Sequence, residues 1–178
     1  MIVIVSDSKR EMIGRRLYEA CKKQGKEVEL VSISDRDIKP CYACNGCTDR
    51  TYGKCVVRDD MDEILPKMAK ADWLVYTHPL TFGGPSYDCK LVLDKSALLG
   101  NRFYKVRNGE IVKGNIVGWK HMMFLAEKSG ASQKEKETYH AYVKEVCKLI
   151  DVEPHVHVVG KNVSEQVIEQ LAKEVTGR

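Results

Sequence analysis

The chain has 178 residues, of which 43% are hydrophobic and 30% charged, and its formal net charge is +4. This length suits one domain with a single core, residues 1–178, and the mild positive charge fits phosphorylated small molecules but is too weak to indicate nucleic-acid binding. No apolar run reaches the roughly 20 residues of a membrane span, and no basic segment precedes the first apolar run, so we expect neither a membrane protein nor a secretory signal.

Short apolar runs rich in β-branched residues predict buried strands. They lie at residues 1–5, 27–33, 72–80, 121–126 and 155–159. Amphipathic stretches that follow these runs predict helices near residues 13–25, 59–71, 86–99, 136–150 and 162–175. In the last helix, Asn162 and Glu165 are spaced like a capping box.

This alternation of strands and helices predicts the fold class. Strands that alternate with helices form a parallel sheet, with helices on both of its faces. The number of strands and the chain length together predict a flavodoxin-like, doubly wound α/β fold with five strands in the order 2-1-3-4-5.

Residues 103–113 do not fit the alternation. Asn108 and Gly109 stand between two short strand-like runs, and Asn-Gly is the strongest signal for a two-residue hairpin turn. We predict a β-hairpin inserted before the fourth strand of the sheet, which can serve as a lid or a dimer arm. A surface excursion without a function is an equally good interpretation.

Two loops follow strands at the edge where doubly wound sheets bind their ligands. In the first loop, the hydroxyl groups of Ser6 and Ser8 and the charges of Lys9 and Arg10 precede a helix, a combination that can hold a phosphate. The second loop is "THPLTFGGPS", residues 77–86, in which the two glycines let the backbone approach a flat ligand. A simple strand-to-helix turn is the alternative for this second loop.

The segment "CYACNGCTDRTYGKC" follows the second predicted strand and holds Cys41, Cys44, Cys47 and Cys55. Without a secretory signal, the chain's seven cysteines favour a reducing compartment, so we expect a cytoplasmic protein whose clustered thiols are ligands or redox groups. The spacing C-x2-C-x2-C-x7-C favours a 4Fe–4S cluster over zinc, which usually takes two separated cysteine pairs, and over free thiols.

Two adjacent segments, "IKPCYACNGCTDRTYGKCVVRDDMDEI" and "ADWLVYTHPLTFGGPSYDCKLVLDK", resemble the iron–sulfur flavoproteins, within the flavodoxin-like NAD(P)H-dependent FMN reductases. The resemblance implies FMN at the edge of the sheet, a 4Fe–4S cluster on the four loop cysteines, and a dimer or higher homo-oligomer. It further implies which residues line the flavin ring: Pro79, Leu80, Thr81, Phe82, Gly83 and Gly84. The sequence departs from the family in its first loop, where "MIG" replaces a step of the Gly-Asn-Thr kind.

These observations predict a redox enzyme or electron carrier that uses FMN and a 4Fe–4S cluster, with NAD(P)H as a possible donor and a small molecule or a protein as its redox partner. Two alternatives stay open at this point. One is a metal-stabilised binding module without flavin, and the other is an FMN reductase with free thiols and no cluster. His155 and His157 share one face of the last strand, and we interpret them as sheet-surface residues rather than metal ligands.

Overall fold

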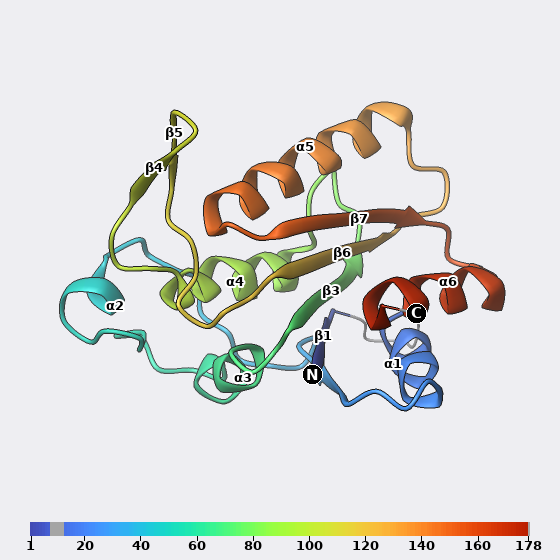
Figure 1. Cartoon of the computed structure of the whole chain (residues 1–178), viewed down its shortest axis with the longest axis horizontal. Coiled ribbons are helices and arrows are strands. Elements are labelled where there is room, and N and C mark those ends of the chain that lie inside the picture. The colour runs from blue at the N-terminus through green and yellow to red at the C-terminus, as the bar shows by residue number, and fades with distance from the viewer. Residues whose placement is uncertain (8–12, 178) are drawn as a thin grey trace.

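The computed structural model describes residues 1–7 and 13–177. Its main sheet has five parallel strands in the order β2-β1-β3-β6-β7, which confirms the predicted flavodoxin-like order (Figure 1). The strands are β1 (Ile2–Ser6), β2 (Val28–Ser32), β3 (Trp73–Pro79), β6 (His121–Glu127) and β7 (Glu153–Val159).

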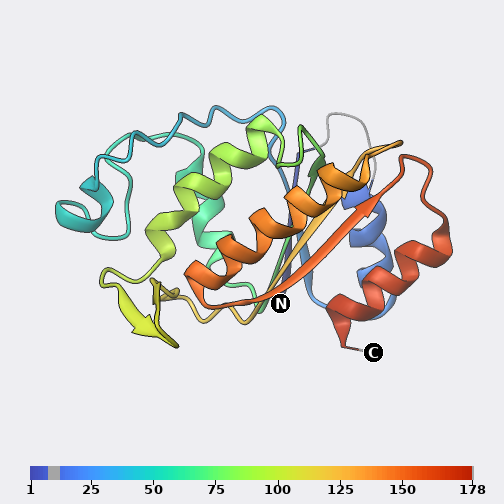
Figure 2. The ribbon, with the colours of Figure 1, turned by 90° about the horizontal axis from the view of Figure 1, so that it is seen from above.

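Helices cover both faces of this sheet, as Figure 2 shows. On one face lie α1 (Ile13–Lys23) and α6 (Glu165–Thr176), and on the other lie α3 (Met61–Met68), α4 (Tyr87–Ser96) and α5 (Gln133–Ile150). The short 3-10 helix η1 (Ala97–Leu99) continues α4. The cap expected at Asn162 lies two residues later, because the Ser164 hydroxyl accepts the hydrogen bond from the Val167 amide. None of the helices in the described ranges is long and apolar enough to cross a membrane.

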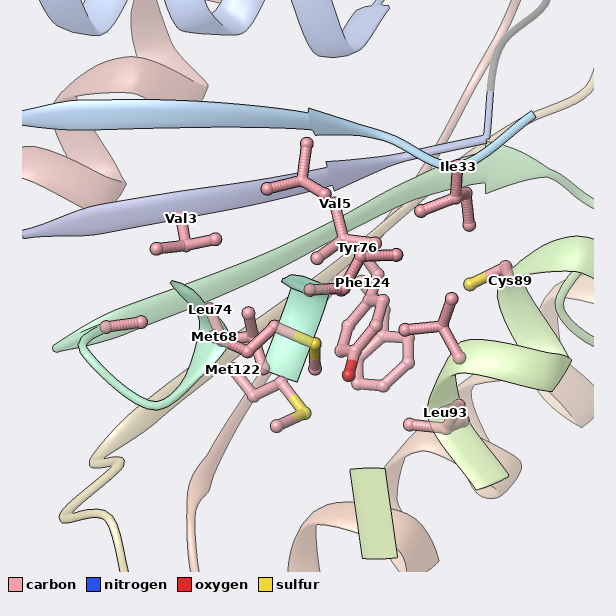
Figure 3. Packing of buried hydrophobic residues seen from close by; sticks show 14 of the residues in the cluster. Val3, Val5, Ile33, Met68, Leu74, Tyr76, Cys89, Leu93, Met122 and Phe124 are labelled. Carbon is pink, nitrogen blue, oxygen red and sulfur yellow. The ribbon is translucent and has the colours of Figure 1, made fainter. Parts of the chain in front are cut away.

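Strand side chains alternate between two apolar cores, as the period of two in a β-strand requires. Val5, Tyr76 and Phe124 point toward α3 and α4, where Tyr76 and Phe124 stack with ring centroids 5.0 Å apart (Figure 3). Ile4 and Leu125 point to the opposite face, toward α1 and α6. Both faces of the central strands are therefore buried, which explains why these strands are continuous apolar runs in the sequence.

The predicted hairpin is confirmed as β4 (Lys105–Arg107) and β5 (Glu110–Val112). Asn108 and Gly109 both have positive φ, 52° and 79°, as the two-residue turn requires. The hairpin is tied to the end of α5, because the Lys113 amide donates to the Leu149 carbonyl at 2.7 Å and the Arg107 guanidinium pairs with the Asp151 carboxylate. Its role as a lid or a dimer arm stays a prediction.

Candidate functional site

Asp7 lies directly after β1, at the edge of the sheet where the carboxyl ends of the strands meet, and its side chain is buried. The Ser34 hydroxyl donates to its carboxylate at 3.3 Å, and the Ser86 hydroxyl donates to the other oxygen. Ser86 is also the N-cap of α4, since its oxygen accepts the Cys89 amide at 3.4 Å. Asp7 thus joins the loops after β1 and β2 to the start of α4, a role that the sequence did not indicate.

Ser6, which we predicted as a phosphate ligand, ends β1 with its side chain buried. Its hydroxyl oxygen accepts a hydrogen bond from the Thr77 hydroxyl at 2.9 Å. Gly14 in α1 comes so close that a Cβ atom there would lie 2.4 Å from the Ser6 oxygen. The Ser6 hydroxyl therefore links β1 to β3 and lies close against α1, and its contact with a ligand stays a prediction. Ser8, Lys9 and Arg10, the other predicted phosphate ligands, lie outside the described residues.

Residues 81–84 form a tight turn between β3 and α4. The amides of Thr81 and Gly84 each donate to the carbonyl of the other, at 3.0 and 2.9 Å. Phe82 and Gly83 between them have φ values of 50° and 76°, the pattern of a type I′ turn. Left-handed backbone is costly for phenylalanine, yet the Phe82 side chain is 93% exposed and gains no packing that offsets the cost. The turn therefore displays an aromatic ring at the edge of the sheet.

The packing of this turn against α5 fixes its position. A Cβ atom on Gly83 would lie 3.0 Å from the Thr138 Cβ, so glycine is required there by both space and backbone angle. The Leu80 amide donates to the Glu127 carbonyl at 3.1 Å, and the Leu80 side chain packs in the core. Of the six residues predicted to line a flavin, Leu80 and Gly83 are buried, and the other four, Pro79, Thr81, Phe82 and Gly84, are at least partly exposed.

His78 lies beneath the turn with its ring buried. Its Nδ1 lies 2.9 Å from the Pro79 carbonyl, and its Nε2 lies 2.7 Å from the Tyr139 hydroxyl. Burial lowers the pKa of this histidine, so the ring is neutral near pH 7. Since a carbonyl only accepts, Nδ1 carries the proton and Nε2 accepts from Tyr139. His78 therefore supports the turn by linking it to α5.

The four loop cysteines are all free thiols; Cys41 and Cys44 are exposed, and Cys47 and Cys55 are half-buried. The backbone between them is left-handed at Ala43, Asn45 and Gly53, with φ values of 52°, 56° and 77°. These positions bend the chain sharply around the short helix α2 (Gly46–Asp49). A Cβ atom on Gly46 would lie 2.6 Å from the Val56 side chain, so the turns of the loop are packed closely against each other.

A single zinc ion and a four-iron cluster make different demands on the loop sulfur atoms. A zinc ion bound by thiolates at about 2.3 Å needs sulfur atoms within about 4 Å of one another. Within the described ranges, one group of three side chains has its potential metal-ligand atoms within 4.8 Å of one another, and it contains no cysteine. A four-iron cluster takes one thiolate per iron, and the four cysteines of this bent loop can supply that number of ligands.

The two ends of the cysteine loop are held at Asp59. Its carboxylate accepts the Lys39 amide at 2.7 Å and the Met61 amide at 3.0 Å, and it also contacts the Lys95 ammonium group of α4. Asp59 is the first residue of the helix predicted at residues 59–71, and sequence reasoning missed this role. The signal was Lys95 itself, a charged residue within the apolar run "LVLDKSALL", where burial requires a partner of opposite charge.

The cysteine loop and the turn at residues 81–84 start from the same edge of the sheet, but the loop then extends away from it. Figures 1 and 2 both show α2 standing beyond α4, on the side away from α1 and α6. Within one chain, the two predicted cofactor sites are thus joined through α4 and the Asp59–Lys95 contact.

The comparison with protein families classifies the chain. The model of the NADPH-dependent FMN reductases matches residues 3–151. The chain belongs to this family. An iron–sulfur flavoprotein of Methanocaldococcus jannaschii is 39% identical over 85 residues, which are 48% of this chain and 43% of that protein. The iron–sulfur flavoprotein of Methanosarcina thermophila is 37% identical over 98 residues, 55% of this chain and 50% of that protein. The aligned region thus spans about half the length of these relatives.

Solved structures of other proteins superpose on nearly the whole of this NADPH-dependent FMN reductase family member. An azoreductase from Bacillus anthracis superposes with a TM-score of 0.65 over 99% of this chain and 96% of that protein, at 17% identity. The NAD(P)H:quinone oxidoreductase of Methanothermobacter marburgensis gives a TM-score of 0.64 over 97% of this chain and 92% of that protein, at 13% identity. At these identities the likeness shows the shared fold alone.

Proposed function

We propose that this chain is a redox flavoprotein that binds FMN beside residues 79–84 and a 4Fe–4S cluster at Cys41, Cys44, Cys47 and Cys55. Residues 1–178 act as one flavodoxin-like domain. NAD(P)H is the proposed electron donor, and a small molecule or a protein is the redox partner. The family to which the chain belongs and the names of its sequence relatives both support this function.

The observation that carries the proposal is the type I′ turn at residues 81–84. It places an exposed aromatic ring, Phe82, at the edge where doubly wound sheets bind ligands. The turn keeps this arrangement despite the backbone cost of a left-handed phenylalanine, which is typical of residues retained for function. Gly84 leaves the backbone beside the ring accessible to a flat ligand.

Each part of the chain has a defined task in this proposal. Bound FMN supplies two-electron and hydride chemistry, and a bound 4Fe–4S cluster supplies one-electron transfer. Phe82 offers an aromatic wall, and Asp7 and His78 hold the surrounding loops in place through their buried hydrogen bonds. We assign no side chain the role of general acid or base.

The oligomer and the compartment are further parts of the proposal. Several large apolar side chains on the cysteine loop and around the turn are exposed, and a second copy of the chain would cover them: Tyr42, Tyr52, Val56, Phe82 and Tyr87. The free state of all seven cysteines supports a reducing compartment such as the cytoplasm.

One set of measurements tests the proposal. The protein is purified without oxygen, its absorption spectrum is recorded, and flavin, iron, acid-labile sulfide and zinc are counted per chain. We expect one FMN and equal amounts of iron and sulfide, about four of each. Cys44→Ala should lose the iron and keep the flavin, and Cys147→Ala, which removes a buried thiol outside the loop, should keep both.

Each other outcome identifies an alternative. Zinc without flavin would show a metal-stabilised binding module. Flavin without iron would show an FMN reductase with free thiols. Unchanged iron in Cys44→Ala would mean that the ligand assignment is wrong.

A further inference from the structure

At the opposite edge of the sheet, where β6 and β7 begin, two histidines and a glutamate come together. His121 and Glu153 are the first residues of these strands and are register partners. His155 follows two residues after Glu153 and therefore lies on the same face. The hydrogen bond from the Glu153 amide to the Lys120 carbonyl, 2.8 Å long, holds the two strand starts together.

The geometry of these three side chains suits a single ion. Their ligand atoms all lie within 4.8 Å of one another. His121 Nδ1 lies 3.1 Å from Glu153 Oε2 but does not form a hydrogen bond with it. Trp73 fixes both imidazole rings, because it stacks on His121 with centroids 4.6 Å apart and lies 4.5 Å from the ring of His155. Small side-chain rotations would bring the ligand atoms to the spacing of about 3.3 Å that a tetrahedral zinc ion requires.

The hydrogen bonding of His155 supplies a second, independent observation. Its Nδ1 lies 2.7 Å from Glu174 Oε1, on α6. A carboxylate only accepts, so Nδ1 carries the proton and the neutral ring has its lone pair on Nε2. Nε2 is buried and has no hydrogen-bond partner among the described residues. A buried nitrogen without a partner is costly, and a carboxylate on the other ring nitrogen is the usual arrangement of a metal-ligating histidine.

We propose that His121, Glu153 and His155 bind a divalent transition-metal ion such as Zn²⁺, with Glu174 as the residue that positions His155. Two imidazoles and one carboxylate are a common ligand set for zinc, and they leave the fourth position to water. The ion would link β6 to β7 and, through Glu174, to α6. The site is separate from the cysteine loop and does not depend on the proposed flavin and cluster. It revises the interpretation of His155 as a sheet-surface residue.

His157 provides the matched control. It lies on the same strand and face, and its Nε2 is 2.9 Å from the other oxygen of Glu174 without forming a hydrogen bond, but it is not one of the three clustered residues. If the contacts with Glu174 are merely structural, neither histidine variant changes the amount of Zn²⁺ bound. A metal site predicts an effect at His155 alone.

The test is equilibrium dialysis of the protein, as purified without oxygen, against Zn²⁺, followed by metal analysis. Wild type and His157→Gln should bind one more Zn²⁺ per chain than His121→Gln and His155→Gln bind. The loop cysteines are the same in all variants, so this difference does not depend on them. Glu174→Gln should weaken the binding by about 10- to 100-fold, as expected for a residue that orients a ligand.

Thermal unfolding with and without Zn²⁺ gives a second readout, because an ion that binds only the folded chain raises its Tm. Zn²⁺ should raise the Tm of wild type and His157→Gln and leave that of His155→Gln unchanged. These histidines are not in the fully buried core, so we expect the variants to fold. Equal Zn²⁺ content in wild type and His155→Gln, or equal losses in His155→Gln and His157→Gln, would overturn the proposal.

Discussion

The Lys95 ammonium group contacts the Asp59 carboxylate, and both side chains are only 1% exposed. Lys95 belongs to α4, which begins after the turn at residues 81–84, and Asp59 holds the two ends of the cysteine loop. A buried ion pair is weak evidence for stability by itself, but removal of one partner leaves an uncompensated charge. The pair therefore holds the ends of the cysteine loop against α4, the helix that follows the turn at residues 81–84.

Lys95→Met should lower the free energy of unfolding by about 3–5 kcal/mol, because Asp59 is then a buried charge without its counter-ion. The measurement is urea unfolding of the variant and wild type. Lys95→Met combined with Asp59→Asn should lose less than the sum of the single changes, since the two groups interact directly.

Lys90 gives the control for this prediction. It pairs with Asp94 on the same helix, and both side chains are 44% exposed. Lys90→Met should change the free energy of unfolding by no more than about 0.5 kcal/mol. Equal losses in Lys90→Met and Lys95→Met would show that burial of the Asp59–Lys95 pair does not set its importance.

Phe82→Gly should have opposite effects on stability and flavin binding. Glycine adopts the left-handed backbone of this position without strain, so the free energy of unfolding of the flavin-free chain should rise by about 0.5–1 kcal/mol. Loss of the aromatic wall should weaken FMN binding by about 0.5–1.5 kcal/mol, or roughly two- to tenfold. Chemical unfolding and flavin titration measure the two effects separately.

Asn108→Gly, in the other type I′ turn, is the matched control. Asparagine tolerates left-handed backbone well, so the gain in stability should be smaller than at Phe82, and FMN affinity should not change. If Phe82→Gly leaves FMN affinity unchanged as well, the ring does not contact the flavin.

His78 should make the fold less stable in mild acid. Burial lowers its pKa below the ordinary value of 6.5 in the folded chain, so the unfolded chain binds a proton first as the pH falls. The free energy of unfolding should therefore decrease from pH 6.5 downward until the folded-state pKa is reached. In His78→Gln this contribution is absent, so the difference between wild type and variant isolates it from the other histidines. A pH dependence between 5 and 6.5 that is the same in both proteins would contradict the assignment.

The fold could be predicted from the sequence because each element follows from local information. Both faces of the central strands are buried, so they appear as apolar runs, and Asn108-Gly109 specifies its turn through backbone conformation alone. The cap of α6 was misplaced because Asn162 and Ser164 are both good capping residues, and their choice depends on where the chain leaves β7.

Candidate sites could be proposed from the sequence only where their residues are neighbours in the chain. The four cysteines and the residues of the turn meet this condition. Other contacts join residues that are far apart in the sequence, because packing of distant elements brings them together. Examples are Asp59 with Lys95, His78 with Tyr139, and His121 with Glu153. The composition of a single segment can mark a charged residue that needs a partner, as it does for Lys95, but it does not identify the partner.

Gly14→Ala should destabilise the fold at the start of α1. A Cβ atom at this position would lie 2.4 Å from the Ser6 oxygen and 2.6 Å from the Thr77 oxygen, and these two hydroxyls are already bonded to each other in a buried site. Overpacking of this kind costs about 1–3 kcal/mol, although alanine is otherwise the better helix former. Chemical unfolding measures the loss, and the exposed neighbour Arg15→Ala should change the free energy of unfolding by less than about 0.5 kcal/mol. A stability gain in Gly14→Ala would mean that α1 can move away from the ends of β1 and β3 at little cost.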